Sequence, residues 1–418
     1  MDYLDELIAS KLKTELAPRK VATVMISKKL VELGVTLTDE QLEKLESDLD
    51  LDQLDTVDID LNDEQMTKLE PHRDSKTGKI TIRFDDQDVK SFGDKVETAI
   101  AGLIPKILTT SSEALLRAWK SQADKIFEEQ RVVRFQFEKN VREIWGKAID
   151  LLEMLHGVCL DTGSGFNQQF RPKAAEDSDL VFEVLTRLHA RSCQIGSEIL
   201  VLLKNGFADG AIARWRTLHE IAVVGMFISK HGNDVAERYL AHRVITDYKD
   251  AIQYKCYCRT LGFGPLTEDE LNTLASNKDE VCKRYGANFK EEYGWASNTL
   301  DNAIPRFTDI EQDVNLQHFR PFYKLANINV HAGSKGATYR LGLPTIESDL
   351  FVAGPSLYGL SEPGQNAAIS INQVTATLLL TIPNLDRLAF LTATQELVGE
   401  VFDEFALAND RLEQRAAG

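Results

Sequence analysis

Four ionisable side chains, Arg214, Arg216, His219 and Glu220, lie within seven residues of one another on an otherwise apolar segment. The chain then continues from 221 to 228 without a charge, which predicts a helix with almost no solvated face. Charged groups inside such a helix are costly unless they pair or hydrogen-bond. The four residues are therefore candidates for a structural ion-pair cluster or for a catalytic site.

The residue types in this cluster fit acid–base chemistry on an anionic substrate. At about 100° per residue, Arg216, His219 and Glu220 share one arc of the helix, whereas Arg214 points nearly the opposite way. Arg216 and Glu220 are close enough to pair, and His219 lies beside them, where it could share the carboxylate. An arginine binds phosphate or carboxylate, and a histidine transfers protons near neutral pH. A buried pair that only fixes helix packing explains the same pattern equally well.

A second set of polar side chains precedes Gly333. Tyr323, Asn327 and His331 are spaced by four residues, which aligns them along one face of a predicted helix that also carries Asn329. His331 is a further catalytic candidate, and the other three are candidates for substrate binding. The alternative for His331 is an interaction with the carboxyl end of its own helix.

His242 and Arg243, with Asp247, lie on the next predicted helix after the one that carries Glu220. Antiparallel packing across a short turn at 232–233 would bring them near Glu220 as substrate-binding residues. A solvated helix face is the simpler explanation for this set.

Apolar residues recur at three- and four-residue spacing over most of the chain beyond residue 89, which predicts a mainly α fold organised as a helical bundle. The predicted helices cover 104–160 (as one helix or two), 177–205, 208–230, 235–261, 268–285, 316–331, 366–380 and 384–413. Glycines at 163 and 165 are predicted to end the first of them. Frequent Gly, Pro and Ser predict little helix over 333–364.

Residues 1 to about 90 predict a small α+β module. A helical pattern covers 3–33, and two similar segments, 37–45 and 61–69, each begin with an N-cap residue and a Gln three positions later, as in a capping box. Residues 57–61 and 79–84 alternate apolar and polar side chains, as half-buried strands do. We therefore divide the chain into a module at 1–90, a helical connector at 91–175 and a bundle domain at 176–418 that carries the polar cluster.

The charge of the chain limits its partners. The net charge of −17 argues against sequence-blind binding to a phosphate backbone. Thirteen Asp or Glu but only two Lys lie between Asp39 and Glu70, so the acidic N-terminal module is a candidate for binding a protein partner. The remainder is only mildly acidic, which leaves a local site for RNA open. Five sparse cysteines, no signal peptide pattern and no apolar run of about 20 residues predict a cytoplasmic protein without a membrane segment.

No motif for a cofactor is found. The sequence has no phosphate-binding loop, no dinucleotide fingerprint and no nucleophile elbow. Glu153 and His156 form one Glu-x-x-His pair where a di-iron bundle needs two, and Cys256-x-Cys258 lacks a second pair for zinc. We therefore expect neither a metal nor an organic cofactor.

The chain resembles the bacterial domain of unknown function 5677 family. The features are a Gly-Ala-rich helical start at 210–213, an Arg-x-Leu-x-Glu-like helix, here from Arg216 to Glu220, and a later Tyr323…Val330-His331 at a helix end. The resemblance covers roughly residues 180 to 335 and leaves the N-terminal module unexplained.

That family is similar in its helical layout to the HEPN ribonucleases, whose signature is an Arg followed four to six residues later by a His, as in Arg214 and His219. The resemblance implies a metal-independent ribonuclease that works at the seam of a homodimer, as a toxin or in antiphage defence. The residues themselves leave a second function open, a non-catalytic helical sensor, scaffold or ligand-binding protein whose Arg–Glu–His cluster is structural.

Overall fold

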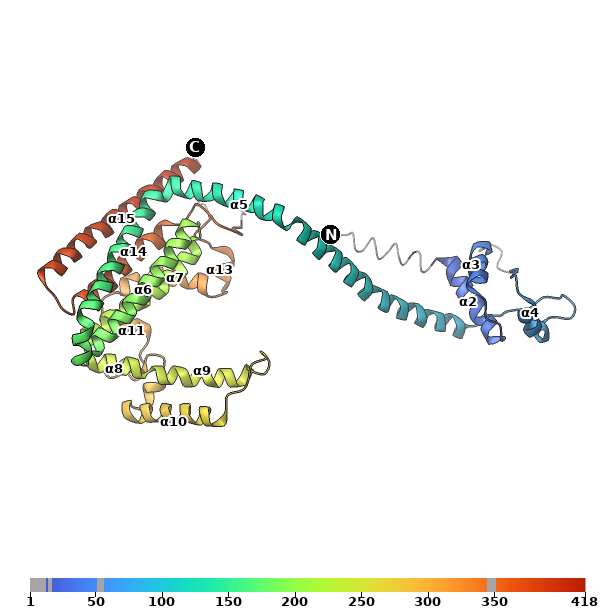
Figure 1. Cartoon of the computed structure of the whole chain (residues 1–418), viewed down its shortest axis with the longest axis horizontal. Coiled ribbons are helices and arrows are strands. Elements are labelled where there is room, and N and C mark those ends of the chain that lie inside the picture. The colour runs from blue at the N-terminus through green and yellow to red at the C-terminus, as the bar shows by residue number, and fades with distance from the viewer. Residues whose placement is uncertain (1–12, 14–16, 51–55, 344–350, 418) are drawn as a thin grey trace. The chain divides into compact units, whose positions relative to one another are not determined.

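The computed structural model describes residue 13 and residues 17–50, 56–343 and 351–417. The protein is mainly α, as predicted, and its elements run from α2 to α15 (Figure 1). It divides into two compact units, Met1–Gln130 and Arg131–Gly418. The division falls within one helix, α5 (Asp86–Glu176), which also contains both boundaries predicted from the sequence, at residues 90 and 175.

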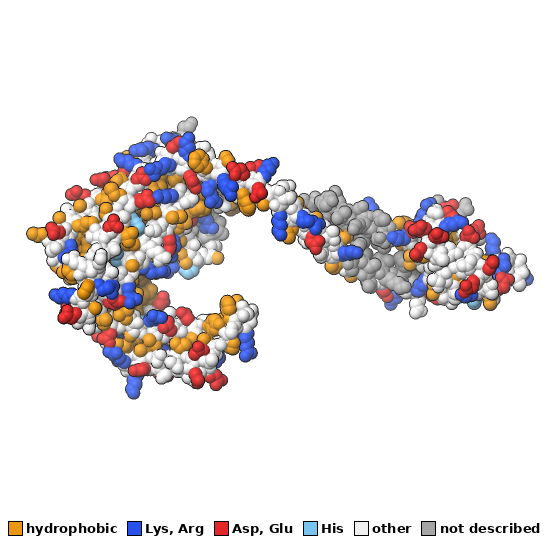
Figure 2. Space-filling model, viewed as in Figure 1, with side chains coloured by type: hydrophobic (Ala, Val, Ile, Leu, Met, Phe, Trp, Pro, Cys, Tyr) orange, Lys and Arg blue, Asp and Glu red, His pale blue; other side chains and the backbone are white. Residues whose placement is uncertain are grey.

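The N-terminal unit contains α2 (Pro18–Glu32), α3 (Asp39–Asp48), α4 (Asp63–Leu69), the 3₁₀ turn η1 (Glu70–His72) and the first part of α5. Both predicted capping boxes form, at Thr38 with Gln41 and at Asn62 with Gln65. The amides of Gln41 and Gln65 also bond to each other, at 2.8 and 3.0 Å. The two similar sequence segments are thus hydrogen-bonded to each other at the starts of their helices. Figure 2 shows acidic side chains gathered on this unit.

The two predicted strands of this unit are wrong. In the described residues the β pairing consists of one isolated bridge, between Arg73 and Ile80. The apolar residues of the alternating segments, among them Ile59 and Ile82, instead pack directly on the small core around Leu30 and Leu45. The alternation of apolar and polar residues therefore indicates which side chains are buried. It does not indicate strands here, because no neighbouring strand in the described residues hydrogen-bonds to the backbone of these segments.

The C-terminal unit is built on the last part of α5 with α6 (Leu180–Lys204), α7 (Ala208–His231), α14 (Ser361–Leu379) and α15 (Leu385–Ala417). Helices α6, α7 and α14 pack against one another, and α15 packs on α14 (Figure 1). Large side chains close this core, and Trp145, Trp215, Phe227 and Phe405 are fully buried.

Shorter helices complete the unit. They are α8 (Asn233–Ala241), α9 (Arg243–Tyr257), α10 (Glu268–Tyr285), η2 (Ala287–Lys290), η3 (Gly294–Ala296), α11 (Phe307–Asp313), η4 (Gln317–Phe319), α12 (Arg320–Val330) and α13 (Ser334–Thr338). Both α11 and α12 pack on α7, and this placement builds the candidate site.

Several predicted helix ends differ from the structure. The long helix passes through 161–165 and ends at Glu176. A Cβ at Gly163 would lie 2.1 Å from the ring of His189 on α6, so this glycine serves close helix packing and does not stop the helix. The predicted helix 235–261 is split at His242 into α8 and α9. The helix predicted from residue 316 begins only at Arg320, after a 3₁₀ turn.

Candidate functional site

Helix α7 lies among α6, α12 and α14, so most of its circumference faces protein. The side chains one and two turns beyond His219, Val223 and Phe227, are fully buried, as the predicted arc requires. Trp215 is fully buried one turn earlier, and its indole N–H bonds to the Ser370 hydroxyl at 3.0 Å. His219, on the same face, is therefore enclosed by the core, with 0% of its surface exposed.

His219 is paired with a carboxylate from another helix. Its Nε2 lies 2.9 Å from Oε1 of Glu311 on α11, and Glu311 is 1% exposed. Because a carboxylate can only accept, Nε2 is the donor. The second oxygen of Glu311 accepts from the guanidinium of Arg320, which supplies a permanent counter-charge.

Aromatic rings enclose this pair. The rings of Trp215, Phe319 and Tyr323 lie 5.2, 5.5 and 6.1 Å from the His219 ring, centroid to centroid. The Nδ1 atom of His219 is buried, and no hydrogen-bond partner for it is found in the described part of the chain. The imidazole is thus shielded from water on every side that the structure describes.

A second ion pair lies on the neighbouring arc of α7. The guanidinium of Arg216 is 3.1 Å from Glu220, as the i, i+4 spacing predicts, and both side chains are about 30% exposed (27% and 31%). The Tyr323 hydroxyl donates to the same carboxylate at 2.5 Å. Burial, together with the Glu220 hydrogen bond, raises the pKa of Tyr323 to about 12, so the phenol stays a neutral donor at physiological pH.

Tyr323 links the two pairs. The guanidinium carbons of Arg216 and Arg320 each lie 4.9 Å from the centre of its ring, within cation–π range. We call Arg216, His219, Glu220, Glu311, Arg320 and Tyr323 the buried network. The structure therefore brings four of the predicted site residues together but assigns His219 to Glu311. The prediction that His219 shares the Glu220 carboxylate is wrong, because its Nε2 bonds to Glu311 and no hydrogen-bond partner is found for its Nδ1 in the described part of the chain.

Sequence reasoning missed Glu311 and Arg320, although one signal for Glu311 was present. Phe307, Ile310 and Val314 define an apolar face of a short helix, and Glu311 lies on that same face, four residues after Phe307. A carboxylate on a buried face needs a cationic or hydrogen-bonding partner. No such signal marks Arg320, which is 23% exposed and follows a 3₁₀ turn.

Arg214 does not join this network. Its Nε lies 2.5 Å from Glu198 on α6, on the side of α7 that the helical geometry predicts. The Arg214–His219 spacing therefore places the two side chains against different helices, with separate carboxylate partners.

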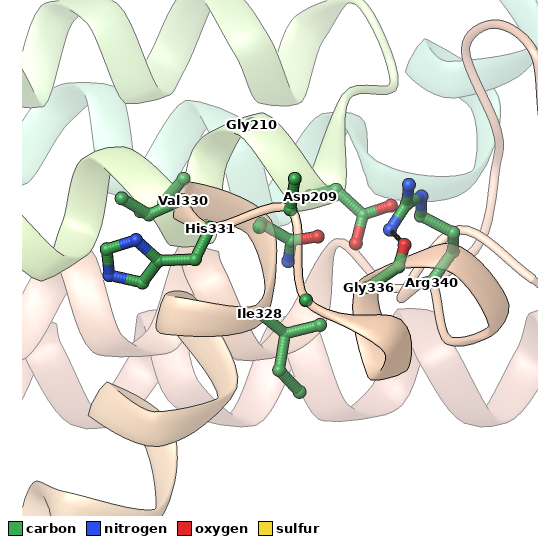
Figure 3. A pocket seen from close by; sticks show the side chains of 11 residues that line it. Asp209, Gly210, Ile328, Val330, His331, Gly336 and Arg340 are labelled. Carbon is green, nitrogen blue, oxygen red and sulfur yellow. Dashed lines mark hydrogen bonds between the residues drawn. The ribbon is translucent and has the colours of Figure 1, made fainter.

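The second predicted set is divided. Tyr323 belongs to the buried network, but α12 ends at Val330 and His331 adopts an extended conformation with an exposed side chain. His331 and Asn329 line an open pocket of about 560 Å³ together with Asp209 and Arg340. We call this the polar pocket. Figure 3 shows His331 at one end of it and Arg340 at the other. His331 thus lies at a site separate from the buried network, whose six residues are not among those that line the pocket.

One unpartnered side-chain donor lies at the polar pocket. The Nδ2 of Asn329 is buried without a hydrogen-bond partner among the described residues. The Oδ1 of Asn327, two residues earlier and not among the pocket-lining residues, is an acceptor that likewise has no partner there. The first turn of α7 borders the pocket, and its amide groups have no partner within the helix. The Oδ1 of Asp209 accepts a hydrogen bond from the amide of Leu341 at 3.0 Å. Arg340 donates to the carbonyl of Gly336.

The third predicted set consists of one histidine in a packing contact and one exposed arginine. The Nε2 of His242 lies 2.8 Å from the carbonyl oxygen of Glu291, so this histidine ties α8 to the η2 segment. Arg243 is 83% exposed and pairs with Asp247 at 3.3 Å, as a solvated helix face does. The main packing partners of α7 are α6, α12 and α14, and α9, which carries Arg243, is not among them.

Two further classes of site were sought. No group of three or more His, Cys, Asp or Glu is placed to hold a metal ion in the ranges that the structure describes. Within the same ranges, every helix is too short or too polar to cross a bilayer. The five cysteines are free, and burial raises the pKa of both Cys159 and Cys193 to about 11, which keeps them as thiols.

The fold and the site define a mainly α bundle with a buried network and a polar pocket on its central helix. Residues 182–348 match the model of a family of unknown function (DUF5677), and this part of the chain belongs to that family. The matched region contains both the buried network and the polar pocket. No curated protein and no solved structure matches the chain.

Proposed function

We propose that the C-terminal unit is a non-catalytic helical sensor or binding protein. In this proposal the buried network is structural and holds α11 and α12 against α7, and the polar pocket receives a small ligand. The observation that carries the proposal is the enclosure of the His219–Glu311 pair, whose members are 0% and 1% exposed.

This enclosure bears on the ribonuclease interpretation, which stays a prediction from the family resemblance. Cleavage of RNA by general acid–base catalysis needs an imidazole within hydrogen-bond reach of the substrate. The Nε2 of His219 is occupied by Glu311, and Arg214 is paired on another side of the helix. An RNA backbone would reach His219 only if α12 separated from α7.

The polar pocket favours a ligand rich in acceptor oxygens. Its volume of about 560 Å³ is in the range of small-molecule sites. The amide of Asn329, the guanidinium of Arg340, the imidazole of His331 and the first turn of α7 all supply N–H groups. Asp209 is the one carboxylate among the lining residues, and a backbone amide already engages it. A carboxylate or phosphate group is the chemistry that these donors recognise.

The catalytic alternative is tested by incubating the purified protein with tRNA, mRNA and rRNA. We expect intact RNA for the wild type and for His219→Gln and Arg214→Ala. We also expect a lowered Tm for His219→Gln, because the substitution disturbs a buried pair. Arg243→Ala, at an exposed arginine, is the control for nonspecific effects. Cleavage by the wild type and the control that both site variants lose at an unchanged Tm would establish the ribonuclease and refute the structural role.

The pocket is tested by thermal unfolding with millimolar inorganic phosphate. We expect a rise in Tm for the wild type and for Arg243→Ala, and no rise for Arg340→Ala. If phosphate leaves the wild-type Tm unchanged, the ligand part of the proposal fails, while the structural part is judged by the RNA experiment alone.

A further inference from the structure

The part of α5 in the N-terminal unit presents large apolar side chains to solvent. Ile104, Leu108, Leu115, Trp119 and Ile126 are 37%, 48%, 48%, 63% and 38% exposed. We call these five residues the α5 stripe. Isolated apolar residues are common on protein surfaces, but a continuous row of this length marks an interaction site.

The stripe has a regular period of eleven residues. Ile104, Leu115 and Ile126 are eleven apart, as are Leu108 and Trp119. Uncharged Ser111 and Gln122, again eleven apart, fill the remaining stripe positions. At about 100° per residue, all seven positions lie within an arc of about 80°. An eleven-residue repeat, at about 3.67 residues per turn, keeps such a stripe facing one partner helix along its whole length.

Most charged residues of this segment lie on the opposite side, whereas Lys125 and Glu129 pair with each other at one end of the stripe. On the same geometry, the side roughly 160° to 220° from Ile104 carries Lys106, Glu113, Arg117, Lys120 and Asp124. One edge of the stripe is widened by Leu116 and Phe127, which are 46% and 52% exposed. The other edge has the buried Ile107, the small residues Ala114 and Ala118, and then the Lys125–Glu129 ion pair. The arrangement is that of a helix made to pack on another helix.

We propose that the α5 stripe pairs with the same stripe of a second copy of this chain. The first argument is area. If each of the seven exposed apolar side chains, including Leu116 and Phe127, loses about 50 to 130 Å² on burial, a symmetric pair of helices buries roughly 1,200 Å² in total. This area reaches the lower end of the range for specific protein–protein interfaces, so two copies suffice without any other surface.

The second argument is charge. Between residues 104 and 130, four cationic residues offset four acidic ones, in a chain of net charge −17. The charges are Lys106, Arg117, Lys120 and Lys125 against Glu113, Asp124, Glu128 and Glu129. Two copies therefore meet along this segment without net repulsion, whereas the acidic segment between Asp39 and Glu70 would repel its own copy. A strongly charged partner would find no complementary charge at the stripe.

Trp119 supplies a direct readout. The chain has four tryptophans, and the other three, Trp145, Trp215 and Trp295, are buried. A change in tryptophan emission with protein concentration therefore reports on the stripe. For the full chain we expect the dimer mass at tens of micromolar in sedimentation equilibrium. We also expect the emission to shift to shorter wavelength as the dimer forms.

Matched variants locate the interface. Leu108→Glu/Leu115→Glu places two charges on the stripe, and Thr110→Glu/Ser121→Glu places the same two charges on exposed positions away from it. We expect the stripe variant to dimerise at least tenfold more weakly with unchanged helical circular dichroism, and the control to match the wild type. A monomeric wild type at 50 μM or a stripe variant that dimerises normally would overturn the proposal. So would a short-wavelength Trp119 emission that does not depend on concentration, since it would mean that the chain covers its own stripe.

Discussion

Replacing Glu311 by Gln removes one charge from an enclosed site without changing the shape of the side chain. The Glu311 carboxylate, 1% exposed, accepts hydrogen bonds from His219 and Arg320. Hydrogen bonds to a charged group contribute about 1 kcal/mol more than neutral ones, so weakening two of them costs about 2 kcal/mol. Breaking a buried ion pair costs about 3 to 5 kcal/mol. Because Arg320 keeps 23% exposure and partial hydration, we expect a loss of about 2 to 4 kcal/mol in the free energy of unfolding.

The assay is urea unfolding followed by tryptophan emission and by circular dichroism at 222 nm. The buried tryptophans Trp145, Trp215 and Trp295 all lie in the C-terminal unit and report on its unfolding. Glu280→Gln, at an exposed position, should change stability by less than about 0.5 kcal/mol.

A second substitution tests the cause of the loss. If the unpaired Arg320 cation is the main penalty, Glu311→Gln/Arg320→Gln should be more stable than the sum of its single substitutions predicts. A Glu311→Gln protein within 1 kcal/mol of the wild type, or strictly additive substitutions, would refute the structural role of this pair.

Three further predictions concern helix packing, the pH dependence of stability and one hydrogen bond. Gly163→Ala puts a methyl group 2.1 Å from the ring of His189 and should lower the Tm by several degrees, whereas Gly165→Ala, which meets nothing within 4 Å, should leave it unchanged or raised. Burial, with a smaller effect of His156, lowers the pKa of His189 from 6.5 to about 4, so the unfolded state binds the proton more readily. The free energy of unfolding should therefore fall by about 3 kcal/mol between pH 6.5 and 4 from this group, and His189→Gln should remove that part of the slope in urea unfolding. Tyr323→Phe deprives Glu220 of one donor at a site about 30% exposed and should cost about 1 kcal/mol by the same assay, so a neutral result would mean that water replaces the hydroxyl.

Helix positions could be predicted wherever local signals agree. The helix predicted at 268–285 is α10 at both ends, because Thr267 and Glu270 form a capping box and Gly286 adopts a positive φ of 100° after the last turn. The prediction of 208–230 for α7 is one residue short for a similar reason, since Gly232 at φ 84° follows it. These signals lie within a few residues of the helix ends and need no knowledge of distant contacts.

The sequence-based predictions fail where the role of a residue depends on a partner that is distant in the sequence. A glycine in a polar segment, such as Gly163, is typical of a helix end. In the structure, the space that its side chain would take is filled by the ring of His189, which comes from another helix. The periodicity of α7 predicts which of its residues share a face, yet the partner of His219 is 92 residues away in the chain. Amphipathic pattern therefore places a polar side chain in the interior, while the identity of its partner follows from tertiary packing alone.

The ionisable residues of α7 contact several different helices. These contacts suggest a structural reason for charged residues on an otherwise apolar helix. Arg214 pairs with α6, His219 with α11, and Glu220 accepts from Tyr323 on α12. Near its end, Lys230 also reaches Asp313 at the end of α11. A buried helix with only apolar side chains can pack in several rotations about its axis, because aliphatic surfaces pack on one another at many angles. These contacts to three different helices hold together at one rotation of α7, and any other rotation separates the buried His219 from Glu311. On the structural role proposed for the buried network, the charges of α7 specify the rotation of this helix in the bundle.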